Sequence, residues 1–374
     1  MRGRVRVLHV IQNLNYGGME RLLADIVLRA DRGLIESHVL CLQYLGRFSE
    51  GLANVAELHL AKQTFRAGML WPASLIRQIR SIGPQVVHTH SGVWYKASLA
   101  ARRAGVPRLV HTEHGRRHPD PRIDRLVDGL AARRTDVVVA VSDALAAQLV
   151  ATLFVSPRRI RVVRNGVDTG LHQPRAESGA LRDELRVPSN APILGSIGRL
   201  EPIKGYDVVV EAMALLAAEW TEGPLPVLVV FGEGSERARL LELARERRIA
   251  GLLYLPGWRD DAHDLHAAST IFTLGSRSEG TSVSLLEAMS AGLCPVVTDV
   301  GGNAAVLGPE LRHRLVPAEN AAALAAAWRD ALGDAPRRAA DGAVARQRVV
   351  REFDLGAMVR QYERIYLGEP SSGP

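Results

Sequence analysis

Two carboxylates, Glu279 and Glu287, stand eight positions apart in the stretch of this sequence best suited to chemistry. Between them lie a glycine, three hydroxyl residues and the start of an apolar pattern with helical spacing. A hydroxyl side chain can cap a helix there, and the free N–H groups of the first turn favour an anion. The stretch could therefore bind a phosphate through its backbone and two hydroxyl-rich groups through its acids, as a ribose, a diphosphate and a sugar would require. The alternative is an ordinary strand-to-helix turn whose glutamates are merely solvated.

A pair of cations, Arg199 and Lys204, follows the apolar run 193–198. In a loop at the carboxyl end of a strand, both side chains can close on one polyanion and hold a diphosphate leaving group without a metal ion. Two unrelated surface cations are the alternative interpretation.

The glycine pair Gly17 and Gly18 follows the first apolar run, 5–11, and would let the backbone approach a ligand closely. No Lys-Ser/Thr pair follows it and the spacing is not G-x-G-x-x-G, so it is neither a Walker loop nor a dinucleotide fingerprint. A simple tight turn remains the alternative.

Histidines gather at the ends of predicted strands in the first half of the chain. They are His88, His90, His111, His114 and His118. A His-x-His pair on a strand points both rings to one face, which would suit zinc, but neither a carboxylate nor a cysteine is obviously paired with them. We therefore favour a single histidine that binds or polarises a substrate.

These candidates need a scaffold of alternating strands and helices. Strands are expected at 5–11, 38–42, 55–60, 86–90, 108–112, 137–141 and 160–164, then at 193–198, 227–231, 252–255, 271–274 and 294–298. Helices are expected between them, which predicts doubly wound parallel sheets. A chain of 374 residues is long enough for two domains, and residues 172–192, rich in proline in a polar setting, indicate the linker. Residues 321–349 predict one alanine-rich helix, and Tyr362 and Tyr366 share one face of the last helix.

Charge is divided unevenly along the chain. Residues 1–175 carry a net charge of +13 and residues 176–374 a net charge of −6. We expect the basic half to face an anionic membrane surface or a phosphorylated lipid acceptor, since no RNP, helix-turn-helix or zinc-finger pattern indicates nucleic acid. Cys41 and Cys294 stand in apolar runs, so buried free thiols and a cytoplasmic location are expected. Neither a signal peptide nor a spanning apolar segment is visible.

The motifs of this sequence, taken in their order along the chain, resemble those of glycosyltransferase family 4, the retaining nucleotide-sugar enzymes of GT-B fold. The resemblance covers almost the whole chain. The matching pieces are Gly17-Gly18-x-Glu20, Val141-Ser142-Asp143, Asn165-Gly166-Val167-Asp168, Gly198-Arg199-Leu200 with Lys204-Gly205, Gly232-x-Gly234, Glu279-x7-Glu287 and Gly301-Gly302. A glutamate that the family often has shortly after the last glycine pair is missing here. A softer likeness is to members that assemble exopolysaccharide or cell-envelope glycans.

The resemblance implies roles for individual residues. Glu279 would bind the donor sugar and Glu287 the ribose, Arg199 and Lys204 would neutralise the diphosphate, and His114 would contact the transferred sugar, with His111 as the alternative. Further residues would line the donor: Gly17, Gly18, Gly198, Gly257, Gly280, Thr281, Ser282 and Val283.

The resemblance also implies an architecture and a mechanism. Two Rossmann-like domains would face each other across a cleft: residues 1–175, with a C-terminal helix at about 355–368, for the acceptor, and residues 190–354 for the donor. Transfer would retain the anomeric configuration by front-side attack, without a metal or other cofactor, onto a glycan, lipid-linked or small-molecule hydroxyl. The acceptor would meet the loops 62–72 and 91–125. The alternatives are a catalytically silent nucleotide-sugar-binding partner and a nucleotide-sugar epimerase of the same fold.

Overall fold

The computed structural model describes residues 3–15, 17–61, 72–115, 122–259 and 261–369. The chain divides into two compact units. The first is residues 1–166 together with 355–374, and the second is residues 167–354. His118, most of the predicted acceptor loop 62–72 and part of 91–125 lie outside the described residues.

The first unit is built on a seven-stranded sheet in the order β3-β2-β1-β4-β5-β6-β7, with every pairing parallel. The strands are β1 (Val5–Asn13), β2 (Ile35–Tyr44), β3 (Glu57–Leu60), β4 (Val86–His90), β5 (Arg108–Glu113), β6 (Val137–Ala140) and β7 (Ile160–Val162). Their helices are α1 (Gly18–Arg29), α2 (Ser49–Leu52), α3 (Ala73–Ile82), α4 (Trp94–Ala104), α5 (Arg122–Ala132) and α6 (Asp143–Leu153). The chain winds outward from β1 to β3 and then returns to β4, so the winding reverses between β1 and β4.

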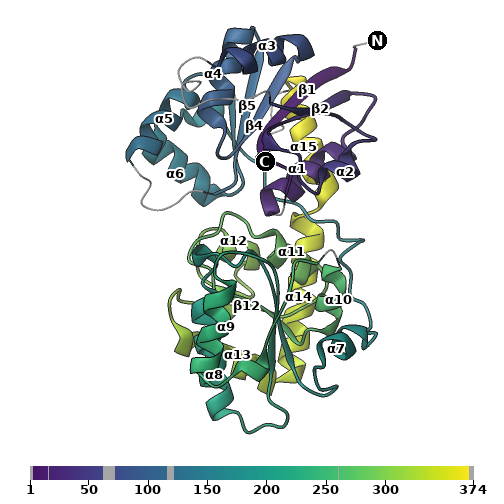
Figure 1. Cartoon of the computed structure of the whole chain (residues 1–374), viewed down its shortest axis with the longest axis vertical. Coiled ribbons are helices and arrows are strands. Elements are labelled where there is room, and N and C mark those ends of the chain that lie inside the picture. Colours follow the sequence, from purple (N-terminus) through teal and green to yellow (C-terminus); the bar gives the residue numbers. More distant parts are fainter. Residues whose placement is uncertain (1–2, 16, 62–71, 116–121, 260, 370–374) are drawn as a thin grey trace. The chain divides into compact units, whose positions relative to one another are not determined.

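The second unit is built on a six-stranded parallel sheet in the order β10-β9-β8-β11-β12-β13. The strands are β8 (Ile193–Ile197), β9 (Val227–Phe231), β10 (Leu253–Gly257), β11 (Ile271–Leu274), β12 (Pro295–Thr298) and β13 (Leu315–Val316). Their helices are α7 (Ala180–Leu185), α8 (Tyr206–Glu219), α9 (Arg237–Glu246), α10 (Ala262–Ala268), α11 (Val283–Ser290), α12 (Asn303–Leu307), α13 (Ala321–Gly333) and α14 (Ala335–Glu352). Helices cover both faces of this sheet, and the winding reverses between β8 and β11 (Figure 1). The predicted doubly wound architecture is confirmed.

Two details differ from the sequence-based expectations. The predicted linker contains α7, whose Leu181 is buried. The single alanine-rich helix is two helices, because Asp334 caps α14 by accepting a hydrogen bond from the Arg337 backbone N–H at 2.9 Å. Proline in the first turn of α14 reinforces that start, since a first-turn residue needs no intrahelical N–H bond.

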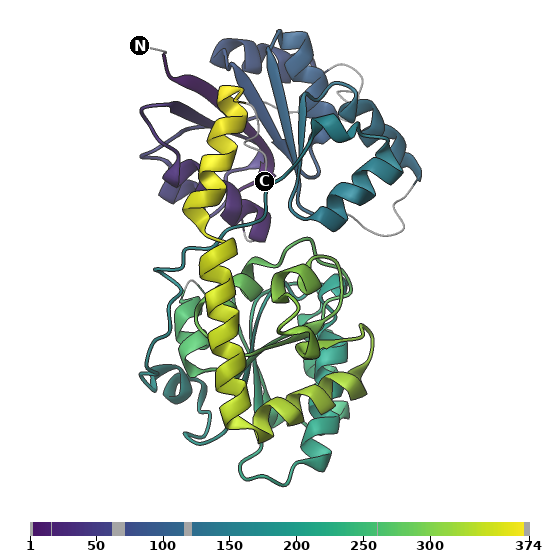
Figure 2. The same ribbon diagram turned by 180° about the vertical axis from the view of Figure 1, so that it is seen from behind.

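The last helix, α15 (Leu355–Leu367), belongs to the first unit and packs against α1 and β1 (Figure 2). Tyr362 and Tyr366 share one face of this helix, as predicted, and the structure shows that both are buried. The Tyr366 hydroxyl lies 2.8 Å from His88 Nδ1, and the Tyr362 hydroxyl lies 3.2 Å from Thr112 Oγ1. Residues from the two ends of the sequence therefore complete one core.

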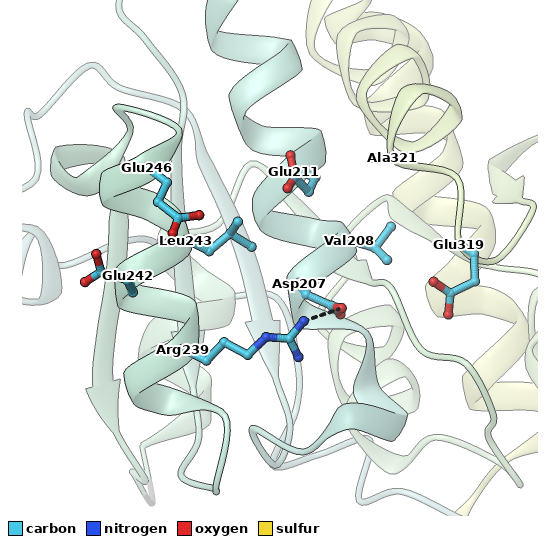
Figure 3. A pocket seen from close by; sticks show the side chains of 9 residues that line it. All are labelled: Asp207, Val208, Glu211, Arg239, Glu242, Leu243, Glu246, Glu319 and Ala321. Atoms are coloured by element: carbon cyan, nitrogen blue, oxygen red, sulfur yellow. Dashed lines mark ion pairs between the residues drawn. The ribbon is translucent and has the colours of Figure 1, made fainter.

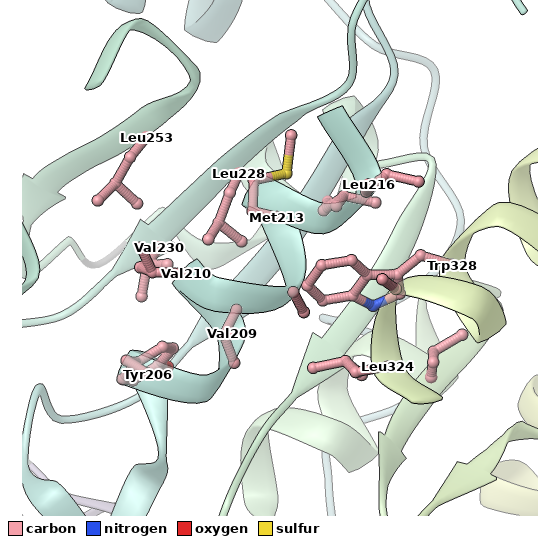
Figure 4. Close-up of a cluster of buried hydrophobic side chains, with 14 of the residues drawn as sticks. Tyr206, Val209, Val210, Met213, Leu216, Leu228, Val230, Leu253, Leu324 and Trp328 are labelled. Atoms are coloured by element: carbon pink, nitrogen blue, oxygen red, sulfur yellow. The ribbon is translucent and has the colours of Figure 1, made fainter. Parts of the chain in front are cut away.

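The main core of the second unit surrounds Trp328 of α13, which is fully buried (Figure 4). Its indole N–H donates a hydrogen bond to Thr273 Oγ1 of β11 at 3.0 Å. Around it pack side chains of α8 and of the sheet, including Met213 and Leu216. This packing fixes α8 and β11, the two elements whose ends carry Lys204 and Glu279.

We expect Trp328→Ala to lower the free energy of unfolding by about 3–5 kcal/mol, since it leaves a large cavity in this core. Trp328→Phe should lower it by about 1–2 kcal/mol, because the Thr273 hydroxyl loses its donor. Urea unfolding measures both changes. Leu215→Ala, at a side chain that is 41% exposed, is the matched control and should change the free energy by less than about 0.5 kcal/mol. Equal losses in Trp328→Ala and the control would contradict the assignment.

Candidate functional site

The loops after β8 and β11 meet at the reversal of winding in the second unit, where open parallel sheets bind ligands. Lys204 ends a short 3₁₀ turn after β8, and Glu279 stands in the loop before α11. Lys204 Nζ donates a hydrogen bond to Glu279 Oε1 at 2.6 Å, and Ser276 Oγ donates to the same oxygen at 2.6 Å. Among the described residues, Glu279 Oε2 accepts no hydrogen bond. One carboxylate oxygen is thus held in place and the other stays available.

Arg277 ties these two loops together. Its guanidinium donates to Asp207 Oδ2 at 2.9 Å, to Glu319 and to the carbonyl oxygen of Pro202. Its backbone N–H donates to the carbonyl oxygen of Ile203 at 2.9 Å. Arg277 is therefore a positioning residue that keeps the Lys204 loop against the Glu279 loop, and these partners raise the pKa of the guanidinium.

Glycines allow the strand-end loops to stack on one another. A Cβ on Gly301, which has φ of +54°, would lie 1.7 Å from the Glu279 carbonyl oxygen. A Cβ on Gly302 would lie 2.0 Å from the Gly280 carbonyl oxygen. The same holds for Gly232, whose Cβ would lie 1.9 Å from the Gly198 carbonyl oxygen. These glycines are explained by backbone packing within the unit, before any ligand is considered.

Helix α11 begins four residues after Glu279, at Val283. Ser282 is its N-cap and accepts a hydrogen bond from the Leu285 backbone N–H, while Thr281 beside it is buried. Val283 is the first helical residue, so the backbone N–H groups of the first turn and the helix dipole are available to an anion. Of the three hydroxyl residues in this stretch, Ser282 is therefore the one that caps the helix.

Glu287 lies about one turn into α11, because the helix begins at Val283. Its carboxylate is nearly buried, and Oε1 lies 3.5 Å from His172 Nε2. The His172 carbonyl oxygen accepts a hydrogen bond from Ser290 Oγ at 2.6 Å. The two glutamates thus stand in different surroundings: Glu279 against a lysine and Glu287 against a histidine.

Three further predicted donor residues, which belong to the second unit, lie at the same edge of its sheet. Gly198 and Arg199 follow β8, and a Cβ on Gly198 would lie 2.8 Å from the Tyr206 hydroxyl. Arg199 is exposed and forms no ion pair within the described ranges, so it is free to meet an anion. Gly257 ends β10 with φ of +94°, and its carbonyl oxygen accepts from the Gly232 N–H at 2.9 Å.

Sequence reasoning missed two contributors to this site. His172 was assigned to the linker, yet it follows the Asn-Gly-Val-Asp motif, where Asp168 Oδ1 accepts from the Gly170 and Leu171 N–H groups at 3.0 Å each and turns the chain. Tyr206 is buried below Gly198, and its hydroxyl lies 3.1 Å from Ser196 Oγ. Burial raises the pKa of Tyr206. Only the short spacing of His172 from a matched motif could have indicated it.

The first unit has its own reversal point, between β1 and β4, and α1 begins there. Gly17 is the N-cap of α1 and Gly18 its first residue, and no side chain caps this helix. The Gly46 backbone packs closely against the same loop, since a Cβ added at Gly46 would lie 2.2 Å from the Asn15 backbone nitrogen. The Glu20 carboxylate of the first turn lies against Gly17, where an added Cβ would be 2.1 Å from its Oε2, so the carboxylate fills the space beside this glycine.

A row of histidines crosses the same point. His114 Nε2 lies 3.1 Å from His90 Nδ1, and His90 Nε2 lies 3.5 Å from His9 Nδ1. His88 contacts Tyr366 and, through Nε2 at 2.7 Å, Thr112 Oγ1. Burial lowers the pKa of His9 to about 3 and that of His114 to about 4, and it holds the pKa values of His88 and His90 well below the ordinary value. All four rings are therefore neutral near pH 7.

The structure separates the roles of His111 and His114. His111 is fully buried, stacks on Trp94 with ring centroids 3.8 Å apart, and lies 2.9 Å from Thr89 Oγ1. A carboxylate does accompany it, contrary to expectation: Glu113 Oε2 lies 3.8 Å from His111 Nε2. His114 lies at the end of β5 and is only partly buried, so of the two it is the one that a substrate can reach.

Nitrogen atoms of His9, His88 and His90 lie within 4.8 Å of one another, the spacing of a possible metal site. Both ring nitrogens of His88 are already engaged, one by Tyr366 and one by Thr112. Ligation by His88 would break one of these bonds in a fully buried setting. The geometry thus fits a hydrogen-bonded core better than a metal centre.

A hollow on the flank of the second unit, between α8 and α9, is lined mostly by acids (Figure 3). Asp207, Glu211, Glu242 and Glu246 contribute carboxylates to it, and Arg239 is paired with Asp207 at 3.8 Å. This charge has the wrong sign for a diphosphate, so the hollow does not compete with the Lys204–Glu279 site.

Comparisons with known proteins support the same division of the chain. The model described as "Glycosyl transferases group 1" matches residues 177–348, and the model described as "Glycosyltransferase Family 4" matches residues 16–171. An Escherichia coli UDP-Gal:alpha-D-GlcNAc-diphosphoundecaprenol alpha-1,3-galactosyltransferase is 31% identical over 239 residues, which cover 62% of each chain. A D-inositol 3-phosphate glycosyltransferase of Kineococcus radiotolerans is 30% identical over 307 residues, 74% of this chain and 70% of that protein.

Solved structures share the fold. HepE of Anabaena, crystallised with UDP and glucose, superposes with a TM-score of 0.85 at 21% identity, over 98% of this chain and all of that one. A glycosyltransferase of Rickettsia africae gives a TM-score of 0.80 at 20% identity, over 99% of this chain and all of that one.

We expect Gly301→Ala to lower the free energy of unfolding by more than about 3 kcal/mol, since a left-handed backbone and a clash with the Glu279 carbonyl coincide. Gly223→Ala is the matched control: φ is +98°, yet nothing lies within 4 Å of the added Cβ. It should lower the free energy by only about 1 kcal/mol. Urea unfolding compares the two, and equal effects would refute the loop-stacking explanation.

The neutral histidines predict an acid-sensitive first unit. The unfolded chain binds protons as the pH falls through the ordinary histidine pKa of 6.5, whereas His9 stays neutral in the fold. Stability is therefore full above pH 6.5 and is lost as the pH falls below it, by up to about 1.4 kcal/mol per pH unit for each such histidine.

His9→Leu should reduce this slope by about one proton between pH 6.5 and about pH 5. Urea unfolding at several pH values measures the slope. The buried His266 of the second unit contributes equally to the wild type and the variant, so it cancels in the difference. An unchanged slope in His9→Leu would show that His9 is protonated in the folded chain.

Proposed function

This chain belongs to the family 4 glycosyltransferases of GT-B fold, and we propose that it transfers a sugar from a nucleoside diphosphate sugar to an acceptor hydroxyl. The observation that carries the proposal is the contact of Lys204 Nζ with Glu279 Oε1, 2.6 Å long, beside the start of α11. It places a cation, a carboxylate and a helix N-terminus at one reversal point of a parallel sheet.

On this proposal the second unit binds the donor. The first turn of α11 from Val283, with Gly280, Thr281 and Ser282 before it, offers N–H groups to phosphate. Glu279 accepts hydrogen bonds from hydroxyls of the donor sugar through Oε2, since Oε1 is already bonded. Glu287 accepts from the ribose hydroxyls, and Gly257 flanks the base with Gly198 at the edge of the site.

Departure of the nucleoside diphosphate is the step that Lys204 and Arg199 assist. An ammonium has three donors, so Lys204 can keep its bond to Glu279 while it also contacts a diphosphate oxygen. Exposed Arg199 adds a second charge, and together with the α11 dipole the two cations stabilise the negative charge that develops on the leaving group. We propose that this set serves in place of a metal ion.

We propose further that the transfer retains the anomeric configuration by front-side attack. In this mechanism the acceptor hydroxyl bonds to the anomeric carbon as the sugar–phosphate bond breaks, and its proton passes to the leaving diphosphate oxygen. Positioning and electrostatics then supply the rate acceleration. In the first unit, neutral His114 suits hydrogen bonding to a sugar, and Gly17 and Gly18 let the backbone at the start of α1 approach the donor closely.

A lipid-linked or glycan acceptor at a membrane surface is the acceptor class we propose. The Escherichia coli relative is named for a diphosphoundecaprenol acceptor. The first 175 residues of this chain carry a net charge of +13, the sign that attracts anionic lipid and diphosphate groups. Within the described ranges, the longest apolar helices fall short of what a bilayer crossing requires. We therefore propose a peripheral enzyme on the cytoplasmic face.

We expect Glu279→Ala and Lys204→Ala each to lower kcat roughly a hundredfold or more, because they remove groups that position the sugar and stabilise the leaving charge. Glu287→Ala should instead weaken nucleoside diphosphate binding about tenfold to a hundredfold with little change in kcat, since a buried charge-assisted hydrogen bond is lost. Calorimetry with nucleoside diphosphates and steady-state transfer kinetics measure the two effects.

Glu222→Ala, at an exposed glutamate of the same unit, is the control and should leave both measurements unchanged. Full turnover in Glu279→Ala and Lys204→Ala would refute the proposed donor site. Nucleotide binding without transfer to any acceptor would instead favour a silent binding partner.

A further inference from the structure

Two histidines and a glutamate gather at the edge of the first unit's sheet, among residues that the proposed reaction does not use. His38 stands on β2, and Glu57 and His59 stand on β3, the edge strand. Nitrogen and oxygen atoms of these three side chains lie within 4.8 Å of one another. We name the three side chains the β2–β3 cluster.

The strand register brings the three side chains to one face of the sheet. His38 is the direct partner of Glu57 in the parallel ladder. His59 lies two residues beyond Glu57, so its side chain points to the same face, because side chains alternate along a strand. The intervening Leu58 packs on the opposite face, in the core that includes side chains of α1 and α2. The order Glu-Leu-His on β3 therefore places both polar residues beside His38.

The distances within the β2–β3 cluster are close to those between the ligands of a zinc ion. His38 Nδ1 lies 3.1 Å from His59 Nε2 and 3.3 Å from Glu57 Oε2, and His59 Nε2 lies 4.0 Å from Glu57 Oε1. Ligand atoms that lie about 2.0–2.1 Å from zinc at tetrahedral angles are about 3.3 Å apart. The Glu57 side chain is 67% exposed, so it can rotate to shorten the longest of the three distances.

Glu36 holds the His38 ring in the orientation that such a site requires. His38 Nε2 lies 3.0 Å from Glu36 Oε1, and since a carboxylate only accepts hydrogen bonds, Nε2 carries the proton. In the neutral ring the lone pair is then on Nδ1, which faces Glu57 and His59. Arg6 Nε donates to the same Glu36 oxygen at 2.7 Å and fixes the carboxylate in turn. A carboxylate that orients a histidine from behind is a usual support of a metal-binding histidine.

The β2–β3 cluster differs in two respects from the row of His9, His88 and His90. In that row both ring nitrogens of His88 are bonded to hydroxyl groups, and all three residues are fully buried. In the β2–β3 cluster a carboxylate adds the negative charge that a divalent cation favours. The exposure of Glu57 also gives an ion and its water access from solvent.

We propose that the β2–β3 cluster binds one Zn²⁺ ion through His38 Nδ1, His59 Nε2 and a Glu57 carboxylate oxygen, with water at the fourth position. The ion would tie the edge strand β3, which is four residues long, to β2. Imidazole nitrogens favour Zn²⁺ over Mg²⁺ and Ca²⁺, which prefer oxygen ligands.

The proposed ion takes no part in the transfer of a sugar. Glu57 begins β3, and His38 stands in the first half of β2, so the ion would lie toward the amino ends of the strands. Gly17 and His114 follow the carboxyl ends of β1 and β5. The zinc site and the proposed reaction therefore stand or fail separately.

Calorimetric titration of the full chain, freed of metal by a chelator, tests the site above the ordinary histidine pKa, where the ligands are neutral. We expect one Zn²⁺ ion to bind per chain, and Mg²⁺ and Ca²⁺ to give no binding heat. Zinc in large excess over its Kd should raise Tm by several degrees, because the ion binds only the folded chain. Absence of zinc binding, or equal binding of all three cations, would overturn the proposal.

Glu57→Gln and His59→Gln each remove one ligand from the less buried side of the cluster, so the fold should be kept. We expect each to weaken zinc binding roughly a hundredfold or more and to abolish the rise in Tm, since loss of a ligand costs more than loss of the residue behind it. Glu36→Gln should weaken binding about tenfold while the stoichiometry stays at one. Unchanged zinc affinity in Glu57→Gln and His59→Gln would place the ion elsewhere and refute the assignment.

His263→Gln is the matched control. His263 Nε2 of the second unit lies 3.5 Å from Asp264 Oδ1, and no third metal ligand joins this pair among the residues that the structure describes. The variant should bind zinc as the wild type does, and an equal loss would show non-specific binding to surface histidines and refute the site. Thermal unfolding of each metal-free variant, together with its binding of nucleoside diphosphates, shows that both units are folded.

Discussion

The ion pair between Lys204 and Glu279 can form only while the loop after β8 and the loop after β11 stay in van der Waals contact. A lysine beside a carboxylate in a nearly buried setting is useful only if neither group can turn away, because an unpaired buried charge is costly. Arg277 holds the two loops together through its hydrogen bonds to Asp207, Glu319 and the Pro202 carbonyl oxygen. The sheet adds a second restraint, because the two loops follow the adjacent parallel strands β8 and β11.

The strand-end loops can approach one another this closely because glycines stand at their points of contact. Gly301 and Gly302 lie against the carbonyl oxygens of Glu279 and Gly280, and Gly232 lies against that of Gly198. The stacked backbones leave the loops little freedom, so that the α11 N-terminus and the carboxylate share a fixed orientation. A site built this way is preorganised: the ligand finds its partners already in place and little ordering is needed on binding.

Strand positions and the donor loops were predictable from the sequence, because buried parallel strands are continuous apolar runs and glycine-rich turns follow them. The strand at 271–274, the loop that carries Glu279, and the shared helix face of Tyr362 and Tyr366 were predicted correctly. The break at Asp334 was missed because alanine-rich sequence on both sides hides a capping residue. The histidine row and the Glu287–His172 contact depend on which strands become neighbours, and one sequence does not carry that information.

The division of the chain between the units has a consequence for synthesis on the ribosome. The second unit is one uninterrupted segment, residues 167–354, so it can fold once that segment has left the exit tunnel. The first unit, although it begins the chain, needs α15 to cover β1 and to give Tyr362 and Tyr366 to Thr112 and His88. The first unit therefore cannot be completed before α15 has been made, and the buried polar row of His9, His88 and His90 stays uncovered until then.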